Sequence, residues 1–151
     1  MKFWDVDKVA QDLRDKVMSE WDKTKYYIAT LFLQLILLSI TGLLFGYGAN
    51  SYTIIAFTLS ALVSYFSIIS VYKSCEKNQE ISVIEALIVI GFPATVKSQT
   101  AYWAVYVVLL SGYYSAFITA SIFTWIFIAL TPAYYALFFS LVKQGVERAN
   151  V

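Results

Sequence analysis

Histidine is absent from this chain of 151 residues, cysteine occurs once, at Cys75, and methionine occurs twice. Zinc, copper and haem iron are held by His, Cys or Met side chains in numbers that this chain does not supply. We therefore expect no bound metal or cofactor. A Ser or Cys nucleophile also needs a neighbouring base, and the long apolar segments contain no His, Lys, Asp or Glu. The sequence predicts a protein that is not an enzyme.

Charge is scarce as well. Charged residues make up 14% of the chain and hydrophobic residues 60%, whereas soluble domains are about a quarter charged. The net charge of +1 lacks the basic excess that is typical of nucleic-acid-binding proteins, so no nucleic acid is expected as a partner. The run at 101–142 holds 42 residues without a charge, about twice what one helix needs to cross a hydrocarbon core of about 30 Å. This run is expected to cross a bilayer twice.

The apolar pattern predicts four spans of about twenty residues, at about 26–47, 51–72, 100–119 and 122–142. Only Gly-Ala-Asn separates the first two spans, which is typical of a tight antiparallel connection. The last two spans form a second hairpin, with a turn expected near 119–121. The sequence thus predicts an all-α, polytopic membrane protein with four transmembrane helices in two antiparallel hairpins, in a membrane domain at 26–151.

The apolar residues 81–96 precede the third span and are interrupted. They contain Glu85, and Gly91 and Pro93 favour a break in a helix. Two interpretations stay open. The segment is either an interfacial helix with Glu85 among the lipid headgroups, or a re-entrant segment that places this carboxylate and the break at a functional site, where Lys97 could fold back to pair with it. A fifth span here would export basic residues, which disfavours it.

The first 25 residues are dense in charge. Six basic and six acidic side chains alternate with apolar ones at intervals of three and four, which predicts an amphipathic helix over 1–25. Because these charges cancel, attraction to anionic lipid contributes little. The apolar stripe is expected either to lie in the membrane interface or to dock on a partner protein. The candidate docking residues are Val6, Val9, Leu13, Val17 and Trp21.

The basic residues predict an orientation. With four spans, all 11 Lys and Arg residues fall on one side, in 1–25, 73–97 and 143–148. The positive-inside rule then places both termini, the amphipathic helix and the middle connection in the cytoplasm. We expect a multi-pass protein integral to a membrane of the bacterial inner-membrane type.

Small and hydroxyl-bearing residues recur at helical spacing in the first two spans. Such residues let helices approach closely, and their hydroxyls either bond within the packed helices or line a thin polar path. We favour helix packing. The candidate packing residues are Ser39, Gly42, Gly46, Ser60, Ser64 and Ser67.

Spans without an ionisable group can pack and bind but offer little chemistry. The first hypothesis is a non-catalytic accessory or structural subunit of a larger membrane complex, with the lipid bilayer and other membrane protein subunits as partners. The second is an oligomeric small channel or transporter, with the serine faces and 81–96 along the route. The third is a membrane-embedded inhibitor or immunity protein that binds one conditional partner.

Overall fold

The computed structural model describes residues 4–45, 51–77 and 81–149, with 34–45 and Thr53 described by their backbone alone. All regular elements in these ranges are helical, so the prediction of an all-α protein is confirmed. In chain order they are α1 (Val6–Arg14), α2 (Glu20–Phe45), α3 (Ser51–Lys77), α4 (Val83–Glu85), the π-helix η1 (Ala86–Ile90), α5 (Gly91–Tyr114) and α6 (Ala120–Arg148).

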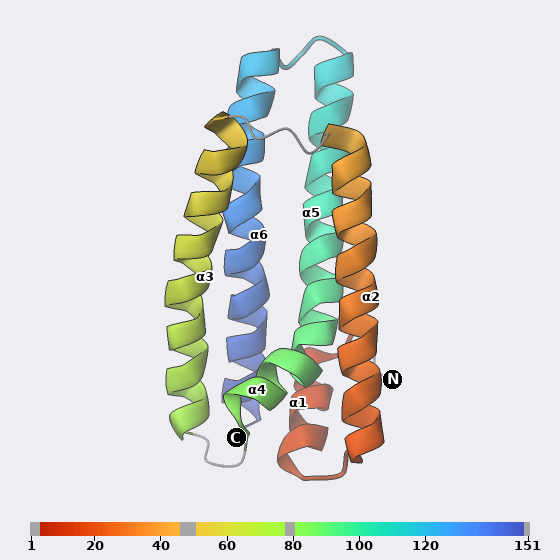
Figure 1. Cartoon of the computed structure of the whole chain (residues 1–151), viewed down its shortest axis with the longest axis vertical. Helices are drawn as coiled ribbons and strands as arrows, with labels where there is room; N and C mark the ends of the chain where they lie inside the picture. The colour runs from red at the N-terminus through yellow and green to blue at the C-terminus, as the bar shows by residue number, and fades with distance from the viewer. Residues whose placement is uncertain (1–3, 46–50, 78–80, 150–151) are drawn as a thin grey trace.

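The four long helices α2, α3, α5 and α6 lie side by side, and the short elements α1, α4 and η1 gather at one end of the bundle, near both chain termini (Figure 1). We call this end the charged end, because it holds the Asp, Glu, Lys and Arg side chains of the described residues. Among the described residues, α3 packs mainly against α6, whereas α2 packs against α5 and η1. Helix α3 therefore does not pack mainly against α2, the helix that precedes it in the chain.

Among the described residues, two helices are long and apolar enough to cross a membrane, namely Ile54–Lys77 within α3 and Ala120–Arg148, which is α6. At a rise of 1.5 Å per residue, the 24 residues of the shorter segment extend about 36 Å, more than the hydrocarbon core requires. Much of the apolar surface of α3 is exposed, with Phe57 at 75% and Phe66 at 67%. Surface of this kind is rare in water-soluble monomers and suits contact with lipid.

The predicted helix over 1–25 is shorter in the structure. The Asp5 carboxylate caps the start of α1 by accepting from the Lys8 amide at 3.0 Å. After Arg14 the chain turns through Lys16, whose φ of 55° lies in the left-handed region, and the Val17 amide donates to the carbonyl of residue 12 at 3.1 Å. This is a Schellman motif, which ends the helix and separates it from α2.

Residues 81–96 are divided among α4, η1 and the start of α5, and α4 lies across the end of the bundle at an angle to α5 (Figure 1). The interfacial and the re-entrant interpretation both stay predictions. Ser82 and Glu85 form a capping box at the start of α4, and the chain continues without a break through η1 into α5. The Gly91 amide donates to the carbonyl of Ala86, five residues earlier, so the interruption expected at Gly91 and Pro93 is absorbed as a π-helical turn. Pro93 lies just after this turn within continuous helix, so its missing N–H removes one donor from the helical hydrogen-bond ladder there.

The turn between the last two long helices lies at 115–119, earlier than the predicted 119–121. Helix α5 ends at Tyr114 in a second Schellman motif, in which Ala116 has a φ of 59° and the Phe117 amide donates to the Gly112 carbonyl at 3.0 Å. The Thr119 hydroxyl then accepts from the Ile122 amide at 3.4 Å and caps α6. The difference arises because the left-handed position is taken by an alanine, which gives no turn signal in the sequence.

Replacing Lys16 by glycine should stabilise α1, because glycine adopts a positive φ without the steric cost that a Cβ carries. We expect a gain of about 0.5–1 kcal/mol, seen as slower amide hydrogen exchange in α1. The matched control is Lys8→Gly, which places the same residue inside the helix and should accelerate exchange. Faster exchange in Lys16→Gly would contradict the assigned turn.

Candidate functional site

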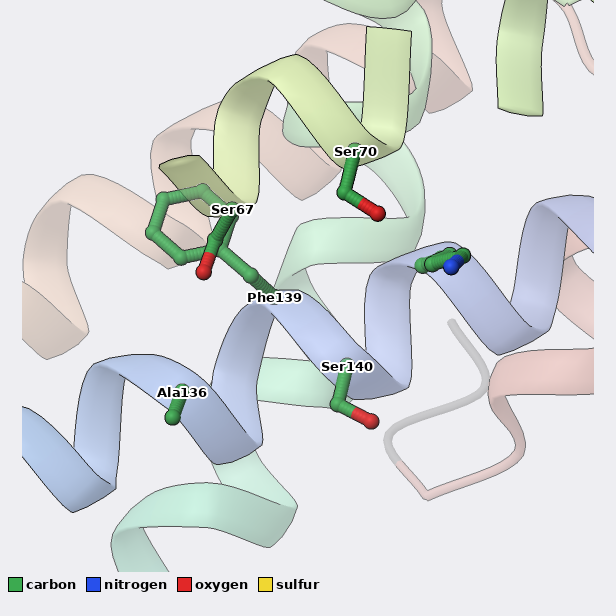
Figure 2. A pocket seen from close by; sticks show the side chains of 6 residues that line it. Ser67, Ser70, Ala136, Phe139 and Ser140 are labelled. Carbon is green, nitrogen blue, oxygen red and sulfur yellow. The ribbon is translucent and has the colours of Figure 1, made fainter. Parts of the chain in front are cut away.

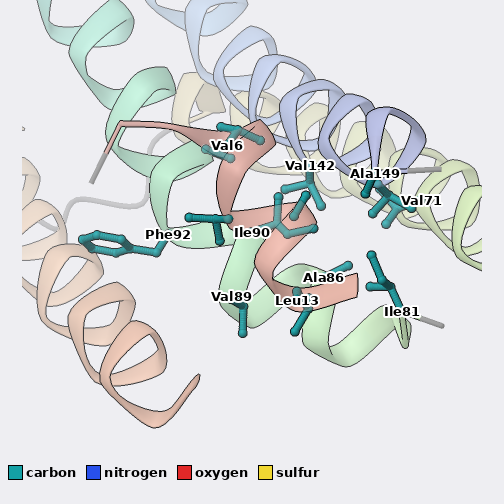
Figure 3. Packing of buried hydrophobic residues seen from close by; sticks show 14 of the residues in the cluster. Val6, Leu13, Val71, Ile81, Ala86, Val89, Ile90, Phe92, Val142 and Ala149 are labelled. Carbon is teal, nitrogen blue, oxygen red and sulfur yellow. The ribbon is translucent and has the colours of Figure 1, made fainter. Parts of the chain in front are cut away.

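The apolar face of α1 is buried against the rest of the chain. Val6, Val9, Ala10 and Leu13 recur at intervals of three and four, so they lie on one side of the helix, and each is at most 4% exposed. They pack against the end of α6 and against η1 (Figure 3). We call this contact the α1 dock. Its members on α6 are Val142, Gly145 and Val146, with the C-cap residue Ala149, and its members on η1 are Ala86, Val89 and Ile90.

Gly145 sets how closely the three elements of the α1 dock approach. A Cβ at this position would lie 2.8 Å from Cγ1 of Val6 and 2.9 Å from Cγ2 of Ile90, which is closer than side chains tolerate. Gly145 is not among the packing residues predicted from the sequence. The signal was present in the pair Gly145 and Ala149, small residues four positions apart on one helical face beside the buried Val142 and Val146.

Polar contacts surround the α1 dock. The Arg148 guanidinium of α6 lies 2.7 Å from an Asp7 carboxylate oxygen of α1. Arg14, at the end of α1, donates to the backbone carbonyl of Ala149 and lies 2.9 Å from Asp15. These pairs are largely exposed, so each contributes at most about 1 kcal/mol and fixes orientation more than stability.

Glu85 joins α4 to α2. Its carboxylate lies 2.7 Å from the Lys23 ammonium and also accepts from the Ser82 hydroxyl at 3.0 Å. The hydrogen bond from Lys23 lowers the pKa of Glu85, against the opposing effect of burial, and bonds to Glu20 and Glu85 raise the pKa of Lys23. The partner of this carboxylate is thus Lys23, and not Lys97 as the re-entrant interpretation had it. Glu85 acts as a cap and an ion-pair partner at the charged end.

The five predicted docking residues do not form one stripe. Val6, Val9 and Leu13 are buried in the α1 dock, where the chain itself covers them, so these three offer no open surface to a partner. Val17 and Trp21 are 74% and 64% exposed because α1 ends before them. The Trp21 ring lies 5.7 Å from the Lys25 ammonium, in a cation–π contact.

The predicted packing residues of α3 meet different surroundings. Ser60 is buried and donates to the Ala56 carbonyl at 2.7 Å, while Ser64 and Ser67 are half-buried. Ser67 lines a pocket between α3 and α6 (Figure 2). Ser39 and Gly42 are described by their backbone alone, and Gly46 lies outside the described residues.

No protein-family model, no curated protein and no solved structure matches this chain. Among the described residues, no group of three or more Cys, Asp or Glu side chains is placed to hold a metal ion. Function is therefore inferred from the chain's own surfaces and contacts.

Replacing Gly145 by alanine should loosen the α1 dock, because the new methyl group forces Val6 and Ile90 to move. Overpacking of this kind costs about 1–3 kcal/mol, which should accelerate tryptic cleavage after Lys16. Val6→Ala in the same chain should restore part of the protection, since it removes the atom that clashes. Gly91→Ala is the control, because its Cβ would meet Phe138 only at 3.7 Å. Equal cleavage in the Gly145 and Gly91 variants would contradict the proposed close approach.

The ion pair of Lys23 and Glu85 should give a defined pH dependence. The pKa of Glu85 is lowered in the fold, so its contribution is complete above the ordinary value of 4.5 and is lost as the pH falls through the lowered value. The pKa of Lys23 is raised, so its contribution is complete below 10.5 and is lost as the pH rises through the raised value. Between these limits we expect about 1 kcal/mol or less, since both groups are partly exposed.

Thermal unfolding in detergent from neutral to acid pH measures this contribution. The Glu85→Gln variant should unfold at a lower temperature at neutral pH and approach the unmodified protein in acid. The control Glu76→Gln removes an exposed carboxylate at the same end and should change little. If both variants behave alike, the ion pair does not join α2 to α4.

Proposed function

We propose that this protein is a four-span, non-catalytic integral membrane protein that serves as a small accessory or structural subunit of a larger membrane assembly. The observation that carries this proposal is the division of the surface. Exposed apolar side chains cover the shafts of the long helices, while the charges and the buried core gather at one end. That division fits a bundle whose shafts face lipid or partner helices and whose charged end lies in water.

The four-span arrangement has support beyond the two apolar helices α3 and α6. Helix α2 has 26 residues and α5 has 24, so each is long enough to cross a hydrocarbon core. Tyr52 and Trp125 contact each other, with ring centroids 6.3 Å apart, near the starts of α3 and α6 and opposite the charged end. Aromatic side chains at this position suit the second membrane interface. Under the positive-inside rule the charged end, with both termini, faces the cytoplasm of a bacterial-type inner membrane.

The hydroxyl groups within the bundle favour packing over permeation. Thr58 donates to the Ile54 carbonyl at 2.9 Å, and Ser111 and Thr124 bond back to their own helices in the same manner. These three hydroxyls donate within their own helices, which is ordinary for packed spans and gives no support to a permeation path. They favour a structural subunit, whereas the serines between α3 and α6 face a pocket at one end of the bundle.

The exposed apolar residues of the charged end provide a surface for a partner subunit. Trp4 and Ile84 are 55% and 70% exposed, and Val17 and Trp21 are similarly open. Large aromatic side chains that project among charges are typical of interface anchors. Of the five residues predicted to dock on a partner, we therefore assign this role to the exposed ones, Val17 and Trp21.

Cysteine labelling tests the topology. In a Cys75→Ala background, single cysteines replace Val17, Lys77 or Phe117, all of which are exposed. A membrane-impermeant maleimide applied to intact cells should label only Phe117→Cys, and permeabilisation should expose the other two. Labelling of Val17→Cys and Phe117→Cys from the same side would overturn the four-span arrangement.

The size and composition of the complex extracted in mild detergent test the function. We expect stoichiometric co-purification with larger membrane proteins, and we expect Val17→Glu with Trp21→Glu to release the protein while insertion is retained. Gln11→Glu is the control, because it adds a charge at an exposed position of α1 and removes no apolar contact. Recovery as a lone homo-oligomer, unchanged by the double substitution, would contradict the subunit role.

A further inference from the structure

A half-open pocket of about 170 Å³ lies between α3 and α6 toward the charged end. Ser67 and Ser70 project from α3 toward α6 (Figure 2). Ser140, Lys143 and the apolar Ala136 and Phe139 contribute from α6. The pocket therefore combines three hydroxyl groups and one ammonium group with an apolar floor.

The serines of this pocket differ from those elsewhere in the bundle. Ser60 and Ser74, on the same helix, donate to carbonyls four residues earlier. Among the described residues, the hydroxyls of Ser67, Ser70 and Ser140 donate no hydrogen bond, and Ser140 only accepts one from Gln144, at 3.3 Å. Three hydroxyl groups that donate no hydrogen bond thus face one pocket. In a transmembrane helix, a serine hydroxyl ordinarily donates to a backbone carbonyl of its own helix.

One cation, Lys143, is among the residues that line the pocket. Lys73 follows Ser70 by three residues, so it lies on the same side of α3. Glu147 lies 3.7 Å from the Lys143 ammonium, and its carboxylate also accepts from Ser74 at 3.1 Å, so it only partly offsets the positive charge. Hydroxyl donors beside an ammonium group match a phosphate oxyanion.

We propose that the pocket lined by Ser67, Ser70, Ser140 and Lys143 binds the phosphate group of an anionic lipid headgroup. The inference rests on the proposed membrane topology, in which this groove opens between two spans near the cytoplasmic interface. A basic pocket between transmembrane helices at that depth is a recurrent headgroup site. Ala136 and Phe139 provide the apolar surface along which the glycerol and upper acyl chain lie.

Native mass spectrometry of the full chain, released from nanodiscs of phosphatidylcholine mixed with phosphatidylglycerol, tests the proposal. The unmodified protein should retain phosphatidylglycerol selectively. Ser67→Ala with Ser70→Ala should weaken retention about tenfold, because hydrogen bonds to a charged group are lost. Lys143→Gln should weaken it about fivefold. The controls are Ser111→Ala, an exposed hydroxyl on α5, and Lys8→Gln, an exposed cation of the charged end.

A second arm distinguishes the source of the phosphate. Glycerol 1-phosphate, added to protein in phosphatidylcholine nanodiscs, should bind at least tenfold more weakly than phosphatidylglycerol if the acyl chain contributes. If the two ligands bind equally and the serine substitutions abolish binding of both, the pocket is a site for a soluble phosphate ester. Lipid retention that the pocket variants and the controls change equally would overturn the proposal. Because the cysteine labelling reports topology independently, failure of this site is distinguishable from failure of the membrane arrangement.

Discussion

The close approach of α1 and η1 to α6 at Gly145 is the contact on which the charged end of the bundle depends. Helix α1 has nine residues, and isolated helices of that length are marginal in water. Its stability comes from the burial of Val6, Val9 and Leu13, and this burial requires the absence of a Cβ at residue 145. The ion pairs beside the α1 dock contribute little stability and mainly fix the orientation of α1, which its apolar contacts stabilise.

The fully buried core and the most exposed apolar side chains lie in different parts of the bundle. At the charged end, Val9, Ile90 and Val142 are fully buried in a core like that of a water-soluble protein. Along the shafts of α3 and α6, large side chains such as Phe57 and Trp125 remain open. The hydrophobic effect can therefore close the charged end in water, whereas association of the shafts in lipid would depend on van der Waals packing and lipid contacts.

Sequence patterns predicted the elements better than their ends and partners. The all-α class and the apolar face of α1 follow from period and composition, which depend on local residues. The end of α1 at Arg14 did not, because Lys16 takes a left-handed conformation that favours glycine. The break expected at Gly91 and Pro93 is a π-helical turn that continues into α5, and Pro93, which has no N–H, lies just after it. The role of Gly145 depends on its contacts with Val6 and Ile90, which are far away in the sequence, so a pattern of neighbouring residues does not predict it.

The dock also joins the first helix of the chain to the last. Asp7 and Arg148, which pair across it, are separated by 141 residues. At translation rates of about 5–20 residues per second, α1 is made about 7–28 seconds before the end of α6. During that interval the part of its apolar face that packs on α6 has no native cover, so it is available to lipid, to a chaperone or to the insertion machinery. The α1 dock can therefore close only after α6 has been synthesised and has packed into the bundle.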